Sequence, residues 1–270
     1  MTTPKPPDEK TGRATGAARW LAGCLALALL APMAGCSSGA DEPAAPDDPP
    51  RSVLFVGNSF SAAHGGLDLH FRALAASMRV PRDVAVARST QDGATLQTLR
   101  QDAATLQALR TGAHDSVVLQ DDIPEYGGPT TDVFLDQVRW FNQEVRARGS
   151  RAVLFMAWPY DRLPWATLDT IAAAHRRVGA ELDIAVAPVA AAMAASRAAR
   201  PALDMLGPDR EHETLHGSYL AACVVYATLF GESPLGATYA PPGITGEEAA
   251  FLQRLAWDSV AAWNAAATAR

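Results

Sequence analysis

Short apolar runs alternate with longer amphipathic stretches from residue 51 onward, and this alternation restricts the fold more than any other feature. Ser52–Val56 is a nearly continuous apolar run that ends at Gly57, as expected for a strand buried on both faces. Four further strands are predicted, at Val84–Ala87, Ser116–Leu119, Ala152–Met156 and, more weakly, Leu182–Ala187. Helical patterns lie between them, at Leu67–Met78, Thr95–Leu109, Val133–Ala147 and Leu168–Val178. Strands alternating with helices of this length predict an α/β fold, with a parallel sheet of about five strands and helices on both faces.

The last third of the chain continues this pattern. We expect an alanine-rich helix after the fifth strand, then a loop, a helix at Gly217–Phe230 and a final helix at about Glu247–Ala267. A near-repeat, Asp92–Arg100 followed by Asp102–Arg110, keeps helical spacing of its leucines, so we interpret it as a duplication within one amphipathic helix. Residues 51–270 are therefore predicted to form one domain.

The N-terminus has the pattern of an export signal. A basic, polar stretch ends at Arg19, and the apolar run Trp20–Met33 is shorter than the roughly 20 residues that a membrane span needs. Met33-Ala34-Gly35-Cys36 resembles the lipobox of bacterial lipoproteins, in which the cysteine thiol receives diacylglycerol. We expect a lipoprotein signal peptide at 1–35, lipidation of Cys36 and a disordered Pro/Ala/Asp-rich tether at 36–50. An uncleaved N-terminal anchor is the alternative. Both place the domain outside the cytoplasm, attached to the membrane of the bacterial cell envelope.

Charge and cysteine content exclude other classes. The formal net charge is −6, and no run of Lys or Arg is present, which argues against a nucleic-acid partner. After processing, only Cys36 and Cys223 would remain, so no disulfide framework is available. Cys223 lies in an apolar helical stretch and is predicted to be a core residue.

Polar residues and glycines follow the predicted strands, where ligands bind in open α/β sheets. Ser59 follows the first strand at a tight turn, where it is either a nucleophile or a helix N-cap. Gly93 follows the second and is either a backbone N–H donor or an ordinary turn residue. Gln120 ends the third and could donate its amide to an oxyanion, or merely begin a polar loop. Trp158–Tyr160 follows the fourth and either forms a pocket wall or packs under a loop.

Asp209 and His212 lie three residues apart, ahead of a predicted helix. This spacing lets a carboxylate oxygen bind imidazole Nδ1, leaving Nε2 to accept a serine proton, the arrangement of a Ser-His-Asp site. A surface ion pair is the alternative interpretation.

Taken together, these blocks resemble the SGNH (GDSL-type) hydrolase superfamily, and more closely a bacterial lipoprotein branch with a Gly-Asn-Ser-Phe first block. The resemblance lies in Val53–Phe60, Asp115–Gln120 and Asp209–Ala222, and extends from residue 51 to about 231. It implies a three-layer α/β/α sandwich with a flavodoxin-like parallel sheet, and an ester hydrolase that needs no metal or cofactor. Carried over, Ser59 would be the nucleophile, His212 the base and Asp209 its orienting carboxylate. The oxyanion hole would combine the N–H groups of Ser59 and Gly93 with Gln120, which stands where the superfamily has Asn.

The resemblance suggests a small ester or an acylated carbohydrate as substrate. Two rival functions remain. His212-Glu213-Thr214-Leu215-His216 is also an HExxH pattern, in which two histidines on one helix face bind zinc and Glu213 serves as general base. Against it, charged residues precede the motif, Gly217 follows at once, and the helical pattern has not yet begun at His212. A non-catalytic pseudo-hydrolase that binds glycans is the second rival.

Overall fold

The computed structural model describes residues 49–128 and 130–268. The predicted signal peptide 1–35, the lipidation site Cys36 and all but the last two residues of the predicted tether 36–50 lie outside these ranges. Five parallel strands form one sheet in the order β2-β1-β3-β4-β5. Their bounds are β1 Ser52–Gly57, β2 Ala85–Thr90, β3 Ser116–Gln120, β4 Arg151–Phe155 and β5 Ala185–Ala187. The predicted α/β class and strand number are confirmed.

Strand position explains how well each strand was predicted. The central strands β1 and β3 are buried almost throughout, so their apolar runs mark them clearly. Strand β2 lies at the edge and is only half-buried, and it continues through the polar residues Arg88–Thr90, beyond the predicted end at Ala87. At the other edge β5 begins at Ala185, because Leu182 is still the last residue of the preceding helix.

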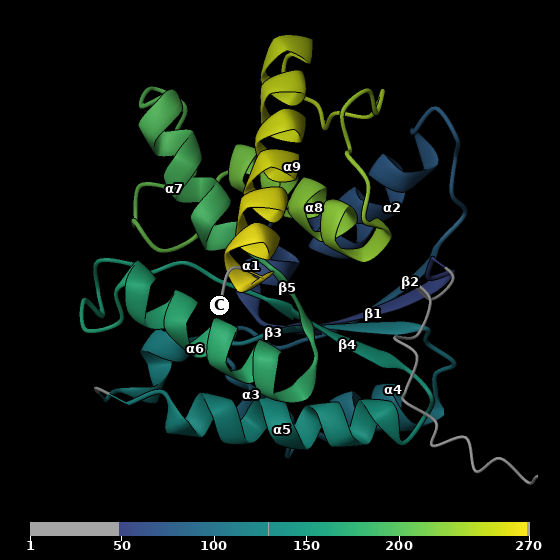
Figure 1. Cartoon of the computed structure of the whole chain (residues 1–270), viewed down its shortest axis with the longest axis vertical. Helices are drawn as coiled ribbons and strands as arrows, with labels where there is room; N and C mark the ends of the chain where they lie inside the picture. The colour runs from purple at the N-terminus through teal and green to yellow at the C-terminus, as the bar shows by residue number, and fades with distance from the viewer. Residues whose placement is uncertain (1–48, 129, 269–270) are drawn as a thin grey trace, which may run out of the picture. The chain divides into compact units, whose positions relative to one another are not determined.

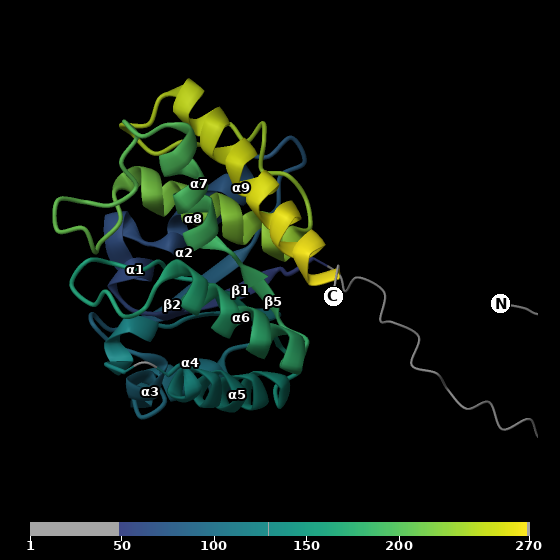
Figure 2. The ribbon, with the colours of Figure 1, turned by 60° about the vertical axis from the view of Figure 1, so that its left-hand side comes forward.

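Helices cover both faces of the sheet (Figures 1 and 2). On one face lie α2 (Leu67–Ala76), α7 (Val189–Ala199), α8 (Leu215–Phe230) and α9 (Gly246–Thr268). On the other lie α3 (Leu96–Leu99), α4 (Ala103–Thr111), α5 (Asp132–Arg146) and α6 (Leu168–Leu182). The short α1 (Ser59–Ala62) follows β1 directly, and two 3-10 turns, η1 (Ala63–Gly65) and η2 (Ile123–Tyr126), complete the described elements.

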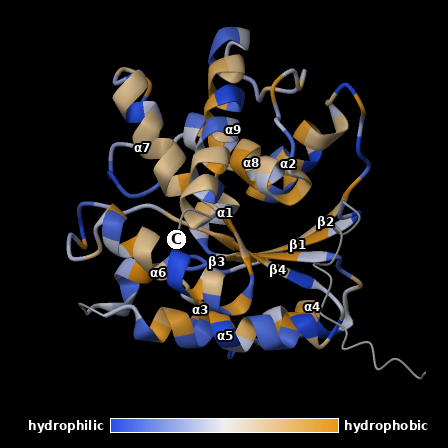
Figure 3. Ribbon diagram, viewed as in Figure 1, coloured by the Kyte–Doolittle hydropathy of each residue, from blue (hydrophilic) through white to orange (hydrophobic). Residues whose placement is uncertain are grey.

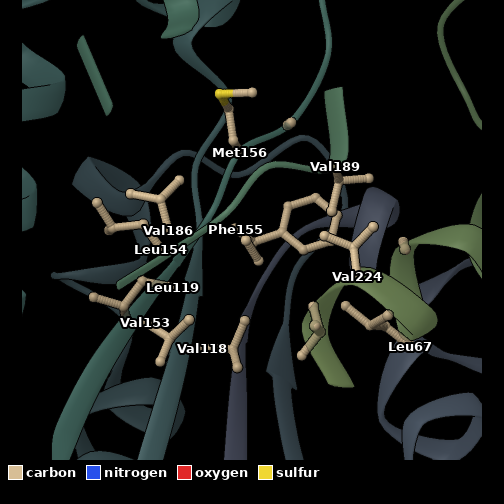
Figure 4. Close-up of a cluster of buried hydrophobic side chains, with 14 of the residues drawn as sticks. Leu67, Val118, Leu119, Val153, Leu154, Phe155, Met156, Val186, Val189 and Val224 are labelled. Atoms are coloured by element: carbon tan, nitrogen blue, oxygen red, sulfur yellow. The ribbon is translucent and has the colours of Figure 1, made fainter. Parts of the chain in front are cut away.

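Helix α8 is buried on every side, since it packs against α2, α7 and α9 and against β5. Figure 3 shows the difference from α5, whose hydrophobic and hydrophilic residues alternate along its length. Phe155, Val189 and Val224 belong to the buried cluster in Figure 4, which joins β4 to α7 and α8. Cys223, also on α8, is a buried free cysteine, as predicted.

Within residues 49–128 and 130–268, no helix combines the length and apolar character that crossing a bilayer requires.

The near-repeat forms two helices, so the prediction of one helix over Thr95–Leu109 was wrong. Each copy has its own N-cap: the Thr95 hydroxyl accepts from Thr98 N–H, and the Asp102 carboxylate accepts from Thr105 N–H at 2.7 Å. An Asp favours a helix start over a helix interior, because its side chain competes for backbone N–H groups. The leucine spacing is therefore helical within each copy, and the N-cap at Asp102 separates the two helices.

Candidate active site

Ser59 is held at a sharp strand-to-helix turn. Strand β1 ends at Gly57, where a Cβ would lie only 2.4 Å from Gln120 Oε1, so no larger residue fits without displacing that side chain. Asn58 then caps α1, its Oδ1 accepting from Phe60 N–H at 3.0 Å. Ser59 is the first residue of α1 and is partly exposed, so its hydroxyl faces the crevice and its N–H has no partner within the helix.

His212 and Asp209 complete a linear arrangement with Ser59. His212 Nε2 lies 3.1 Å from Ser59 Oγ, and His212 Nδ1 lies 2.8 Å from Asp209 Oδ2. The other oxygen, Oδ1, accepts from the backbone N–H groups of Glu211 and His212, each at 3.1 Å. The hydrogen bond from the His212 ring lowers the pKa of Asp209, with help from the Glu211 N–H. Asp209 is therefore ionised at neutral pH and can orient the imidazole.

The loop that carries His212 is fixed at several points. Gly207 N–H donates to His212 O at 2.7 Å, and Thr214 N–H donates to Met205 O at 2.9 Å. The Thr214 hydroxyl in turn caps α8. Two contacts attach this loop to other elements. Trp158 Nε1–H donates to Glu211 O at 2.8 Å, and His64 Nε2 lies 2.9 Å from Glu213 O.

Aromatic rings pack next to His212 and support the geometry of the Ser59–His212 pair. The Phe60 ring, next to the serine, lies 5.6 Å from the His212 ring and 4.8 Å from the Trp158 ring, centroid to centroid. Phe60 and Trp158 are both almost completely buried. The edge-on contact with Phe60 supports the imidazole in the orientation that faces Ser59.

The three predicted oxyanion donors lie at the ends of β1, β2 and β3. The Ser59 N–H has no hydrogen-bond partner within α1. Gly93 has φ +67°, is exposed, and makes no hydrogen bond within the described part of the chain. Gln120 is completely buried, and its Oε1 accepts from Asn58 N–H at 2.8 Å and from the Ser61 hydroxyl at 3.1 Å. Its amide Nε2 is buried and has no partner among the described residues.

A buried polar network, which the sequence did not reveal, lies behind the serine turn. Asn58 Nδ2 donates both to Ala94 O and to Asp122 Oδ2, at 3.1 Å each, so this side chain connects the serine turn to the loop of Gly93 and to the end of β3. The Tyr160 hydroxyl donates to Asp122 Oδ1 at 2.9 Å. Burial raises the pKa of Asp122 to about 7. The sequence signal for this network is the run of three polar residues, Gln120, Asp121 and Asp122, at the end of a buried strand.

The HExxH interpretation does not fit the local structure. Helix α8 begins at Leu215, so His212 and Glu213 precede it and do not share a helix face with His216. Both ring nitrogens of His212 already face Ser59 and Asp209. Across residues 49–128 and 130–268, no group of three His, Cys, Asp or Glu side chains is placed to hold a metal ion.

Comparison with known proteins gives the fold. No family model and no curated protein matches the sequence. Among solved structures, a DUF4886 family protein from Bacteroides uniformis aligns with a TM-score of 0.60 at 17% identity, covering 78% of this chain and 94% of that one. An acetylxylan esterase from Geobacillus stearothermophilus aligns with a TM-score of 0.53 at 15% identity, over 66% and 94%. A lipase/acylhydrolase from Enterococcus faecalis aligns with a TM-score of 0.54 at 18% identity, over 70% and 100%.

The chain has an SGNH hydrolase-like fold. At these identities the likeness establishes the architecture alone, so any SGNH-type chemistry has to be argued from the side chains of this chain. In that fold Ser59 follows the first strand, and His212 precedes a helix that packs against the sheet.

Proposed function

We propose that the protein is a serine hydrolase that cleaves carboxylic esters with a Ser59-His212-Asp209 triad. The observation that carries the proposal is the continuous chain of contacts Ser59 Oγ–His212 Nε2 and His212 Nδ1–Asp209 Oδ2, at 3.1 and 2.8 Å. A serine hydroxyl is a weak nucleophile unless a positioned base takes its proton, and this chain provides that base together with its orienting carboxylate.

The reaction proceeds through an acyl-enzyme. Ser59 Oγ attacks the ester carbonyl carbon while His212 Nε2 accepts the hydroxyl proton. The negative oxygen of the tetrahedral intermediate is held by the N–H groups of Ser59 and Gly93. Gln120 Nε2, which is buried, would join them as a third donor only after its side chain turns toward the substrate. Collapse of the intermediate breaks the bond to the alcohol, which leaves with the proton from His212. Water then attacks the acyl-enzyme with His212 as base, and the carboxylic acid departs.

The substrate that we propose is a small ester or an acylated carbohydrate. Two of the structural neighbours are described as an acetylxylan esterase and a lipase/acylhydrolase, which supports an ester as the bond cleaved. We also propose that Cys36 carries a lipid that attaches the domain to the cell-envelope membrane, outside the cytoplasm. Cys36→Ala should then move the protein from the membrane fraction to the soluble fraction.

Steady-state hydrolysis of nitrophenyl acetate tests the proposal. The wild-type chain should turn over this ester, and activity should survive a metal chelator. Ser59→Ala should abolish turnover and leave the circular dichroism spectrum unchanged. A folded wild-type protein that cleaves no ester would instead favour a non-catalytic binding protein.

A further inference from the structure

A cavity of about 550 Å³ opens beside the loop that carries His212. Its walls are residues 158–168 from the β4–α6 loop and the start of α6, one face of α7 from Ala190 to Ala198, and the segment 201–206 that follows α7. Arg210, between Asp209 and His212, also lines it. The volume falls within the range of about 300–1,000 Å³ that is typical of small-molecule sites.

The cavity lies at the same edge of the sheet as Ser59. Its walls follow the carboxyl ends of β4 and β5, and β4 lies two strands from β1, which is about 10 Å. In Figure 2 the loops that precede α6 and α8 lie on the same side of the domain as α1. Trp158, a lining residue, contacts the Phe60 ring and hydrogen-bonds to Glu211 O. Trp158 therefore connects the wall of this cavity to the residue next to Ser59 and to the loop that carries His212.

The lining is mainly aliphatic. Met193 and Met205 are flexible, polarisable side chains that adapt to a chain of variable shape. The two aromatic residues of the lining, Trp158 and Tyr160, offer a sugar no free donor, because Trp158 Nε1–H donates to Glu211 O and the Tyr160 hydroxyl donates to Asp122 Oδ1. The other apolar lining residues are alanines, prolines and leucines, which include Ala166, Leu168, Ala190, Ala194, Leu203 and Leu206.

The charges of the lining balance. Arg197 and Arg210 are matched by Asp161 and Asp204, and all four are at least partly exposed. A charged occupant would therefore gain no net attraction from the wall. A sugar ring could bind these charged groups only with the hydroxyls that face them, and its other hydroxyls would be buried against aliphatic side chains, which costs free energy. An uncharged hydrocarbon chain fits best.

We infer that this cavity, the α7 pocket, binds an aliphatic chain of the ester substrate, so that the preferred substrates carry a chain several carbons longer than acetyl. The inference rests on the proposed ester hydrolysis at Ser59. It adds that the sugar or other polar part of an acylated substrate lies outside the α7 pocket. Each methylene group buried in such a site raises affinity about fourfold.

The test uses the full chain and two isomeric esters, ethyl hexanoate and hexyl acetate, with ethyl acetate as the short reference. Wild type should cleave at least one isomer with kcat/KM more than about tenfold above that of ethyl acetate. Ala194→Trp places an indole into the α7 pocket from an exposed position on α7. It should remove most of this advantage and leave ethyl acetate within about twofold of wild type.

Matched variants keep the result interpretable. Ala199→Trp makes the same substitution at an exposed position of α7 outside the lining, and it should leave all three esters unchanged. Leu203→Ala enlarges the α7 pocket from the opposite wall and should shift the preference to longer chains. The isomer affected by Ala194→Trp identifies whether the acyl or the alcohol chain occupies the α7 pocket.

Two results would overturn the inference while leaving the hydrolase intact. One is a wild-type protein that cleaves ethyl acetate and both isomers equally well. The other is an Ala194→Trp variant that is unaffected, or that loses all three activities in equal proportion. Absence of any ester cleavage by the wild type would instead refute the proposed function itself.

Discussion

Ser59 Oγ and His212 Nε2 lie 3.1 Å apart, although 153 residues separate them in the chain. The contact exists because β1, an inner strand of the sheet, ends at Gly57 just before Ser59, while the loop before α8 returns to the same edge. Three contacts hold that loop in place: Gly207 N–H to His212 O, Trp158 Nε1–H to Glu211 O, and His64 Nε2 with Glu213 O.

Asp209→Asn should lower kcat with little change in KM. The carboxylate orients the His212 ring and stabilises the imidazolium that forms, and an amide can favour the wrong tautomer. The Asp209 side chain is 53% exposed, so water screens its charge. We therefore expect a loss of about 10²-fold, smaller than the about 10⁴-fold loss seen for a buried triad aspartate. Asp258→Asn, at an exposed position of α9, is the control. Equal kcat in both variants would remove Asp209 from the triad.

Gln120→Ala should lower kcat about 10²–10³-fold if Gln120 Nε2 stabilises the oxyanion. Ser61→Ala is the matched control, because it removes one hydrogen bond to Gln120 Oε1 and leaves the amide nitrogen in place. That variant should retain most of the activity. Full activity in Gln120→Ala would show that Gln120 is not a donor, and two backbone N–H groups would then form the oxyanion hole.

Much of this site could be predicted from sequence, because its residues stand directly after strands. A buried strand is marked by its apolar run, so the residue that follows it, such as Ser59, is placed at the sheet edge with little ambiguity. Asp209 and His212 are close in sequence, and their spacing alone predicts a contact. Their approach to Ser59 came from the resemblance to a known family, since no local pattern encodes where the loop before α8 returns.

Other features depend on tertiary context that the sequence does not reveal. The Asn58–Asp122 hydrogen bond joins residues 64 positions apart, and neither residue is unusual in isolation. The edge position of β2 made its polar second half look like a loop. The break between α3 and α4 depends on a cap at Asp102 that the leucine spacing concealed. The α7 pocket is formed by three segments whose packing no local pattern predicts.

The Asn58–Asp122 pair should behave as an exchangeable unit. Asn58→Asp would place two carboxylates in the position of a 3.1 Å hydrogen bond, so it should lower the melting temperature and the activity together. Adding Asp122→Asn restores one donor and one acceptor and should recover part of the loss. Recovery is incomplete because the Ala94 carbonyl also loses its donor. Thermal unfolding and kcat/KM of the four proteins of this cycle give the coupling directly. Strictly additive effects would contradict a positioning role for the pair.

Glu213→Gln should change the pH dependence of stability but not abolish activity. Burial raises the pKa of Glu213 from 4.5 to about 7, so the folded state binds this proton more tightly than the unfolded state does. The stabilisation is complete below about pH 4.5 and is lost as the pH rises to about 7. Wild type should therefore lose up to about 3 kcal/mol over this range through Glu213, and the variant should not.

The comparison must be made between the two proteins, since His175 acts in the opposite direction. Its burial lowers the pKa from 6.5 to about 4, so its contribution is present above pH 6.5 and is lost as the pH falls toward 4. Urea titrations at pH 4.5, 6 and 8 give the required difference. Identical pH dependences of the free energy of unfolding in wild type and Glu213→Gln would refute a raised pKa at Glu213. Loss of ester hydrolysis in Glu213→Gln would instead favour the zinc mechanism, in which Glu213 is the general base.

The most direct test of the central claim is covalent labelling of the folded chain with a fluorophosphonate, followed by peptide mass spectrometry. The account predicts one phosphonate per chain, on Ser59, with labelling abolished in Ser59→Ala and strongly slowed in His212→Ala. Labelling at another residue, or none in a protein that still cleaves esters, would contradict the assignment of Ser59 as the nucleophile.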